Sequence, residues 1–250
     1  MSAIIENMRL DLKEAMTSGM DFVIGVIANL IAISISVLFI HVIYSQTVGI
    51  PSWSYRDMLA LVGTVELLWT VFNMFFNRFD VISWEINDGK FDIELIRPIS
   101  IVKNLLLPTF RLAQLSNLVV SVVLIMYGAA GASLFRFLVY MLYLAMGMLI
   151  IWGYGFLIVA VAFKTVWVDT FWSALTVFHS YSQYPLEIFS QKVRKILTYI
   201  IPTALFGYFP ALALVKGEFS IIPFIVAPIF FIVCANILNY ALRIYTSAGG

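Results

Sequence analysis

Six runs of mostly apolar residues, most of them about twenty residues long, constrain this chain more than any other feature of its sequence. A helix needs roughly 20 consecutive apolar residues to cross the hydrocarbon core of a bilayer. The runs span residues 22–44, 57–77, 108–128, 136–162, 166–184 and 220–242. The pattern predicts an all-α integral membrane protein with six transmembrane helices, forming a single domain over residues 1–250.

The composition supports lipid as the solvent for much of the surface. Of the 250 residues, 62% are hydrophobic and only 12% are charged, and the mean hydropathy is +0.98. A soluble domain carries about a quarter charged residues, so this chain has too few to cover a water-exposed surface. The net charge of +1 comes without a basic run, which gives no indication of nucleic acid as a partner.

Two segments outside the clear spans have a predicted structure of their own. Residues 1–21 repeat apolar residues at helical spacing and predict a helix lying in the membrane interface, with a solvated helix as the alternative. Residues 195–214 are apolar but broken by Pro202, Gly207 and Pro210. These breaks favour a re-entrant pair of helices over a seventh crossing. Spans one and two then occupy 22–77, spans three to five 105–194, and span six with its tail 215–250.

The distribution of lysine and arginine predicts the orientation. Cytoplasmic loops carry more basic residues than outer ones. With both termini in the cytoplasm, nine basic residues fall inside and six outside. The outer set includes the cluster Lys192, Arg194 and Lys195, whose side chains would have to snorkel to the headgroups.

Polar residues recur on one face of two predicted spans. Span two carries Glu66, Thr70, Asn73 and Asn77, and span three carries Arg111, Gln114, Asn117 and Ser121. Such stripes are costly in hydrocarbon, so they face other helices or a hydrated path. One interpretation is hydrogen bonding between helices, and the other is the lining of a substrate route. Glu66 is the only carboxylate near the middle of a span, which makes it the candidate for a proton- or ion-coupled carrier.

Catalytic and metal-binding motifs are missing from the sequence. The single Gly-Lys pair, Gly89-Lys90, lacks the upstream glycine and the Ser/Thr of a P-loop. His41 and His179 are far apart in sequence, and Cys234 is the only cysteine, which excludes an intrachain disulfide. We therefore expect that the chain is not an enzyme and binds no metal or cofactor itself.

The polar segment 78–104 is too long for a turn and too short for a domain. Helical spacing places Phe91, Leu95 and Ile99 on one side, with Asp88, Asp92 and Arg97 on the other. Gly89 can break the chain and Pro98 can end the helix. The pattern predicts an amphipathic cytoplasmic helix, which either docks a partner or lies passively on the membrane.

The order W-E-I-x-x-G-x-F-D-x-x-L-I-R-P, from Trp84 to Pro98, resembles a cytoplasmic loop of type-2 ABC exporter permeases. The resemblance is greatest to the branch known only as ABC transport-system permeases. A second stretch supports it, because Tyr184-Pro185, Ile201-Pro202 and Pro210-Ala211 occur in the same order before the last span. Phe91 stands where leucine is commoner in that branch, which exchanges one apolar residue for another.

The resemblance implies a permease subunit in the cell membrane that is driven by a separate ABC ATPase, which would bind the ATP and magnesium. It implies a second permease subunit, identical or related, and a hydrophobic or amphipathic substrate. The loop would be a coupling helix in a groove of the ATPase, with coupling positions at Glu85, Gly89, Asp92, Leu95, Arg97 and Pro98. Tyr184, Pro185, Pro202 and Pro210 would belong to re-entrant helices on the outer side.

Overall fold

A computed structural model of the chain describes residues 9, 13, 19–96, 98–165 and 168–245, and they form a helical protein. The longer helices are α2 (Gly19–Gln46), α3 (Tyr55–Phe75), α7 (Leu115–Gly128), α8 (Leu134–Ala162), α9 (Val168–Ser182) and α12 (Ile222–Arg243). The shorter ones are α4 (Arg78–Asn87), α5 (Asp92–Leu95), α6 (Ile101–Leu105), α10 (Gln191–Lys195) and α11 (Tyr208–Val215). Single turns are η1 (Leu112–Gln114), η2 (Leu186–Ile188), η3 (Ile196–Ile200) and η4 (Thr203–Leu205). The all-α prediction is confirmed for the described residues.

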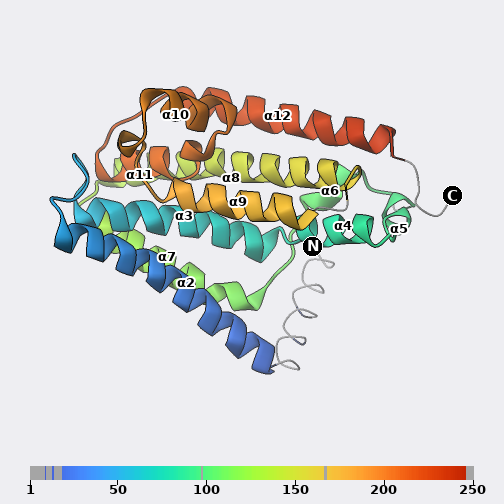
Figure 1. Ribbon diagram of the computed structural model, residues 1–250, viewed down its shortest axis with the longest axis horizontal. Helices are drawn as coiled ribbons and strands as arrows, with labels where there is room; N and C mark the ends of the chain where they lie inside the picture. The colour runs from blue at the N-terminus through green and yellow to red at the C-terminus, as the bar shows by residue number, and fades with distance from the viewer. Residues whose placement is uncertain (1–8, 10–12, 14–18, 97, 166–167, 246–250) are drawn as a thin grey trace.

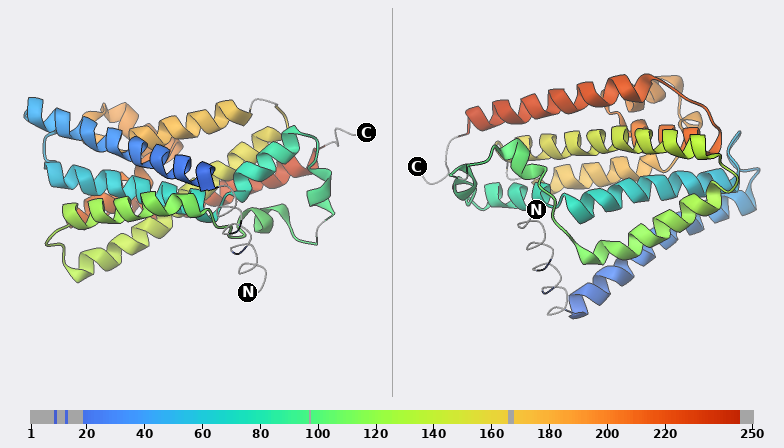
Figure 2. Two further views of the ribbon diagram at one scale, coloured as in Figure 1. Left: turned by 90° about the horizontal axis from the view of Figure 1, so that it is seen from below. Right: turned by 180° about the vertical axis from the view of Figure 1, so that it is seen from behind.

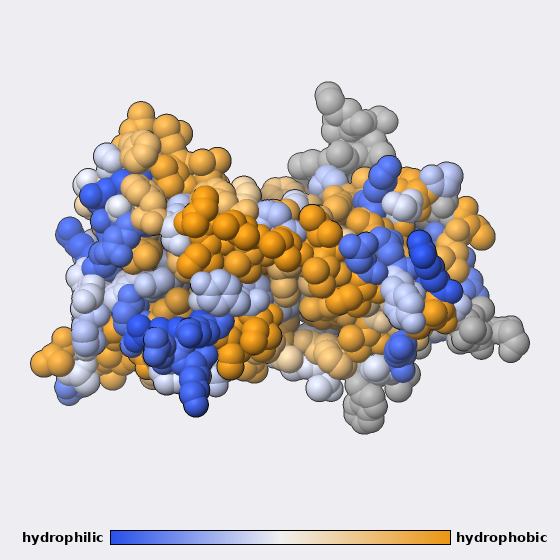
Figure 3. All heavy atoms as spheres, turned by 90° about the horizontal axis from the view of Figure 1, so that it is seen from above, coloured by the Kyte–Doolittle hydropathy of each residue, from blue (hydrophilic) through white to orange (hydrophobic). Residues whose placement is uncertain are grey.

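The long helices run side by side along the long axis of the molecule (Figure 1). α12 packs along α8, and α3 packs against α7, with α2 alongside α3 and α7 (Figure 2). Helices α4, α5 and α6 lie at one end, beside the end of α12, whereas α10, α11 and the α2–α3 turn lie at the other (Figure 1). Hydrophilic residues gather toward both ends, and a hydrophobic belt separates them (Figure 3). This surface is the one expected of a protein that crosses a bilayer along its long axis.

Four of the predicted spans are confirmed as helices long and apolar enough to cross a membrane. They are α2, α3, α8 and α12, and a bent helix pair could supply a fifth crossing in the described part of the chain. The predicted span 108–128 is shorter, with an apolar helix only over Leu112–Gly128, and α9 has only 15 residues. Six crossings therefore remain a prediction. The helix predicted for residues 1–21 lies mostly outside the described residues.

The shortening of the third span has a local cause at the end of α3. The last carbonyls of a helix lack partners within it. Here the carbonyl oxygens of Phe75 and Met74 accept hydrogen bonds from the backbone N–H groups of Thr109 and Arg111, at 2.7 and 3.0 Å. The start of the predicted span is therefore extended chain that caps α3 and cannot itself be helical.

Small residues let α3 and α7 approach closely, as is common between helices in membranes. A Cβ atom built on Gly63 would lie 2.9 Å from the carbonyl oxygen of Ser121 in α7. One built on Gly128 would lie 2.5 Å from the carbonyl oxygen of Arg56 in α3. At the start of α3, near Arg56, Ser54 and Asp57 form a capping box that fixes where the helix begins.

The predicted break in residues 195–214 is confirmed. The helices Gln191–Ile200 and Thr203–Val215 meet at an angle of 76°, and Pro202 lies at the bend. Proline has no backbone N–H and disrupts the helix that precedes it. This geometry fits either a broken span or a re-entrant loop.

Candidate functional site

The segment 78–104 is the largest group of polar residues between two long helices, and it folds into α4, α5 and α6. A turn at Gly89, with φ of 71°, separates α4 from α5. This left-handed conformation is easily adopted by glycine and is costly for other residues. Pro98 follows α5, as expected for a residue that ends a helix. Both predicted breaks are confirmed, but the single helix between them has only four residues.

The predicted amphipathic face of this segment is wrong. Phe91 is completely buried, whereas Leu95 and Ile99 are 48% and 44% exposed. The physical reason is the turn at Gly89, because Phe91 lies before the first residue of α5 and points into the bundle. The residues that do form an exposed apolar group at this end are Ile93, Leu95, Ile96 and Ile99. We call this group the apolar edge.

The residues expected to couple to a partner have different environments. Glu85 is half-buried near the end of α4, and Gly89 makes the turn. The Asp92 carboxylate accepts a hydrogen bond from the Tyr245 hydroxyl at 3.3 Å. Leu95 and Pro98 are exposed. Arg97 lies outside the described residues.

A buried ion pair in this segment was missed by sequence reasoning. The Glu94 side chain is only 2% exposed, and its Oε2 accepts hydrogen bonds from Arg78 at 2.9 Å and from Asn104 at 2.5 Å. The Arg78 side chain also donates to the Asn104 Oδ1 at 3.3 Å. This network joins α5 to α4 and α6. The three residues are separated along the chain, so periodicity carries no signal for it.

Asp80, on the first turn of α4, lies close to the end of α3. Burial raises the pKa of its carboxyl and Asp169 adds to this effect, while Arg111, 3.7 Å away, opposes it. A pocket of about 250 Å³ opens beside Asp80 between α3, α4 and α9. Its lining is mainly aromatic and amide side chains: Trp69, Phe72, Asn73, Phe76, Asn77 and Trp172. Asn73 also donates to the Trp69 carbonyl at 2.8 Å, a bond within α3.

Glu66 lies deeper in α3 and faces α9. It is 7% exposed, and its Oε1 accepts a hydrogen bond from the Gln183 side chain at 2.7 Å. The His179 Nε2 lies 3.4 Å from the same oxygen, and the His179 ring lies 4.7 Å from that of Trp69. Glu66 therefore connects α3 with the end of α9. This contact agrees with the interpretation that the polar stripe forms hydrogen bonds between helices. Its two partners are 113 and 117 residues away in the chain, and residue spacing gave no sign of them.

The predicted stripe of the third span does not join this cluster. Arg111 pairs with Asp80, and Gln114 is half-buried in the single turn η1. Asn117 is 8% exposed on α7, where its backbone carbonyl oxygen accepts a hydrogen bond from the Ser121 hydroxyl at 2.6 Å. The stripe therefore spreads over an irregular segment and a helix, and the contacts described for it do not include Glu66.

With these sites described, comparison with known families becomes informative. A family model described as ABC-2 family transporter protein matches residues 30–249. The chain belongs to this family of ABC-2 transporters. The match covers every described long helix except the first part of α2, and it includes the whole segment 78–104. Separate comparisons with curated proteins and with solved structures found no match.

The protein is therefore a type-2 ABC permease, a membrane component of a transport system, and its family implies ATPase partners in a transporter complex. The resemblance noted at the loop is confirmed. Among the described residues, no group of three or more His, Cys, Asp or Glu side chains is placed to hold a metal ion.

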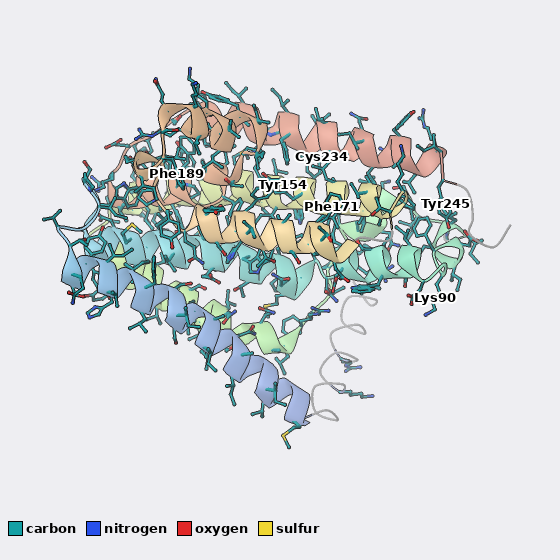
Figure 4. All side chains as sticks on the ribbon, viewed as in Figure 1. Lys90, Tyr154, Phe171, Phe189, Cys234 and Tyr245 are labelled. Carbon is teal, nitrogen blue, oxygen red and sulfur yellow. The ribbon has the colours of Figure 1, made fainter. Side chains whose placement is uncertain are left out.

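The end of the ABC-2 permease opposite α5 holds the residues predicted to be re-entrant. Glu187 accepts hydrogen bonds from the Trp53 indole N–H at 3.1 Å and from the Tyr208 hydroxyl at 2.7 Å. This ties the α2–α3 turn to the bent segment. Tyr184 packs against Phe39 of α2 at 6.3 Å between ring centroids. The three prolines of this part of the chain are also buried: Pro185, Pro202 and Pro210. Phe189, which belongs to this end, lies far from Lys90 and Tyr245 at the other (Figure 4).

An apolar pocket of about 320 Å³ lies near the middle of the bundle, between α8, α9, α12 and η3. Tyr154 of α8 and Phe171 of α9 line it, together with Phe178, Ile201 and Phe230. Tyr154 lies in the central part of the molecule, as does Cys234 of α12 (Figure 4). Cys234 is 1% exposed. A pocket with this apolar lining can accommodate an apolar part of a bound molecule.

Proposed function

We propose that this ABC-2 permease is the transmembrane subunit of an exporter driven by a separate ATPase subunit, which binds the ATP and magnesium. The observation that carries the proposal is the family match over residues 30–249, which includes the loop from Trp84 to Pro98. The chain lacks a P-loop, so its energy would come from a partner. The complex would contain two ATPases and two permeases, the second permease being identical or related.

The proposed topology has six crossings in the cell membrane, with both termini in the cytoplasm. α9 and the α7 region would supply the two crossings beyond α2, α3, α8 and α12. The bent segment around Pro202 would be re-entrant on the outer side. The excess of basic residues at the end that holds α4 to α6 supports this orientation.

The proposed docking element is the apolar edge, formed by Ile93, Leu95, Ile96 and Ile99. These side chains are 44 to 83% exposed, and α5, which carries two of them, lies at one end of the molecule (Figure 1). A small apolar group rimmed by charged residues is typical of a protein interface. Here the rim includes Asp88 and Lys90, whose ion pair spans 2.8 Å. A groove in the ATPase is the occupant we infer.

In the proposed mechanism, ATP binding brings the two ATPases together and each moves the loop that is docked in it. The movement shifts the permeases between inward-open and outward-open states. The substrate would be a hydrophobic or amphipathic molecule, which the apolar pocket beside Tyr154 supports. Glu187 and its donors Trp53 and Tyr208 would be part of the outer closure, because they join the outer turn to the bent segment.

The test is to purify the tagged permease from its native membrane and weigh the intact complex. We expect a mass equal to two permeases and two P-loop ATPases. Ile96→Glu should remove the ATPases because it places a charge in the apolar edge, whereas Val48→Glu should not, since Val48 is exposed between α2 and α3 at the opposite end of the molecule (Figure 1). A complex without any ATPase would contradict the proposal.

The alternative, a proton- or ion-coupled carrier that uses Glu66, is not favoured. Family membership supports an ABC permease, and the Glu66 carboxylate is already engaged by Gln183. A carrier also gives no reason for an exposed apolar edge on a loop. Normal transport by a Glu66→Gln variant would count against the carrier.

A further inference from the structure

We propose that an aromatic ladder on α8 is the mechanical link between the docking loop and the α8–α12 pair of the permease. The ladder consists of Trp152 and Phe156 of α8 and of Phe163, the residue that follows the end of the helix, and they are spaced four and then seven residues apart. These spacings place the three rings along one face of the helix. The role of the ladder in transport rests on the proposed function. Its existence as a packed unit can be tested without a partner.

On one side, the ladder receives three rings from the segment that follows α3. Phe76 meets Trp152 with ring centroids 4.9 Å apart, Phe79 meets Phe156 at 5.5 Å, and Phe91 meets Phe163 at 4.9 Å. Phe79, Phe91 and Phe156 are completely buried. The part of the loop that precedes the apolar edge is therefore held against α8 by aromatic packing.

On the other side, the same rings meet α12 and the residue that follows it. Phe231 lies 6.3 Å from Trp152 and 5.3 Å from Phe156. Tyr245 lies 5.2 Å from Phe163 and 5.3 Å from Phe91, so these three rings contact one another. The Tyr245 hydroxyl also donates to the Asp92 carboxylate. A displacement of the loop would therefore reach α8 and α12 together.

Gly155 explains why Phe79 can approach α8 so closely. A Cβ atom built on Gly155 would lie 2.4 Å from the Cδ1 of Phe79, closer than two such carbon atoms can approach. Phe79 is buried between the rings of Phe72 and Phe156, with centroid distances of 5.4 and 5.5 Å, so any shift of its ring disturbs these contacts. A side chain at position 155 would push the loop away from α8.

The backbone segments that join the loop to α3 and α7 are not helical, so they transmit a rigid movement poorly. α3 ends at Phe75, and the residue after it, Phe76, has a non-helical conformation, with φ of −126° and ψ of 36°. On the far side, residues 107–111 are not helical. Packed interiors transmit displacement because they resist compression. The aromatic contacts therefore give the loop a packed connection to α8 and α12, in addition to its ring contact with α3, where Phe72 lies 5.4 Å from Phe79.

The first experiment measures backbone amide hydrogen exchange in the purified permease alone. In a Phe163→Ala variant, we expect exchange at residues 88–96 and 238–243 to become about tenfold faster, because both ends lose ring contacts. The matched control is Phe135→Ala, which removes a ring pair with Phe219 at the opposite end of α8. This control should leave both regions unchanged. An effect confined to the residues next to Phe163 would overturn the proposal.

Two further variants cover the case in which Phe163→Ala does not fold. Phe163→Leu keeps an apolar side chain and should raise exchange in both regions about twofold. Gly155→Ala should raise it at residues 78–96, because Phe79 is displaced, but not at residues 222–230 at the start of α12. Unchanged exchange in both variants would overturn the ladder as a packed unit.

The second experiment tests the role of the ladder in the complex with the ATPase. Phe163→Ala should still co-purify with the ATPase, because the side chains of the apolar edge are unchanged, while transport falls at least about tenfold. Normal transport together with the altered exchange would overturn the mechanical role. If the wild-type permease binds no ATPase, the proposed function fails, and the exchange result still decides whether the ladder is real.

Discussion

At the scale of single residues, the most informative position is the buried carboxylate of Glu66. A polar side chain in a membrane bundle has either a structural partner or a role in moving a solute. Glu66 has the Gln183 amide as a partner, 2.7 Å away, and the pair joins α3 to the end of α9. We therefore interpret it as a brace between helices.

Glu66→Leu removes the acceptor and leaves the Gln183 amide without a partner. We expect a loss of about 1 kcal/mol in the free energy of unfolding, which is typical of a polar contact between membrane helices. Glu66→Gln keeps an acceptor oxygen and should cost less than about 0.5 kcal/mol. Thermal or chemical unfolding in detergent measures both values. Equal losses in the two variants would contradict the brace.

Gly89 is a second position where one residue decides the local structure. Gly89→Ala places a side chain at φ of 71° and should cost about 1 kcal/mol locally, so that the ATPase stimulation by substrate falls while membrane insertion stays normal. Gly89→Pro should be worse, since proline fixes φ near about −65°. The control is Gly131→Ala, because Gly131 has φ of 95° in the turn before α8. Loss of stimulation in the control as well would show that the effect is not specific to the loop.

At the scale of elements, the loop is a set of short helices that could not be stable alone. Isolated helices shorter than about 12 residues are marginal in water. α5 has four residues and α6 has five, so their order comes from contacts with neighbours. The buried Glu94, held by Arg78 and Asn104, supplies the polar part of those contacts, and Phe91 supplies the apolar part.

Glu94→Ala should loosen this loop because it leaves the Arg78 guanidinium without its carboxylate partner. We expect a local cost of about 2 kcal/mol, and cleavage by trypsin after the exposed Lys90 should become roughly tenfold faster. The control is Asp57→Ala, which removes the ion pair with Lys216 at the opposite end, 2.9 Å long in the wild type. Similar acceleration in the control would indicate a global effect and contradict the local anchor.

At the scale of the whole molecule, the two polar ends should face opposite sides of the membrane. The apolar edge lies at one end, and the loop with Glu218 lies at the other, before the start of α12 (Figure 1). A hydrophobic belt separates the two polar ends, so a bilayer that surrounds the belt places these ends on opposite sides (Figure 3). Which end faces the cytoplasm decides whether an ATPase can reach the apolar edge.

Single-cysteine labelling tests this orientation with little background, because Cys234 is the only cysteine and is buried. In intact cells, an impermeant maleimide should label a Glu218→Cys variant and not a Lys90→Cys variant. After permeabilisation, both should react, because Glu218 and Lys90 are exposed. Labelling at position 90 from the outside would contradict the docking of an ATPase there.

The sequence alone determined the helical class, four long apolar helices, the bend at Pro202 and the turn at Gly89. These features depend on properties of neighbouring residues: apolar length, a missing N–H group and a permissive φ. Only the tertiary structure decided that Gln183 binds Glu66, that Glu94 is buried, and that Phe91 points inward, away from Leu95. Those outcomes depend on which distant side chains meet when helices pack, and the spacing of residues along one helix does not contain that information.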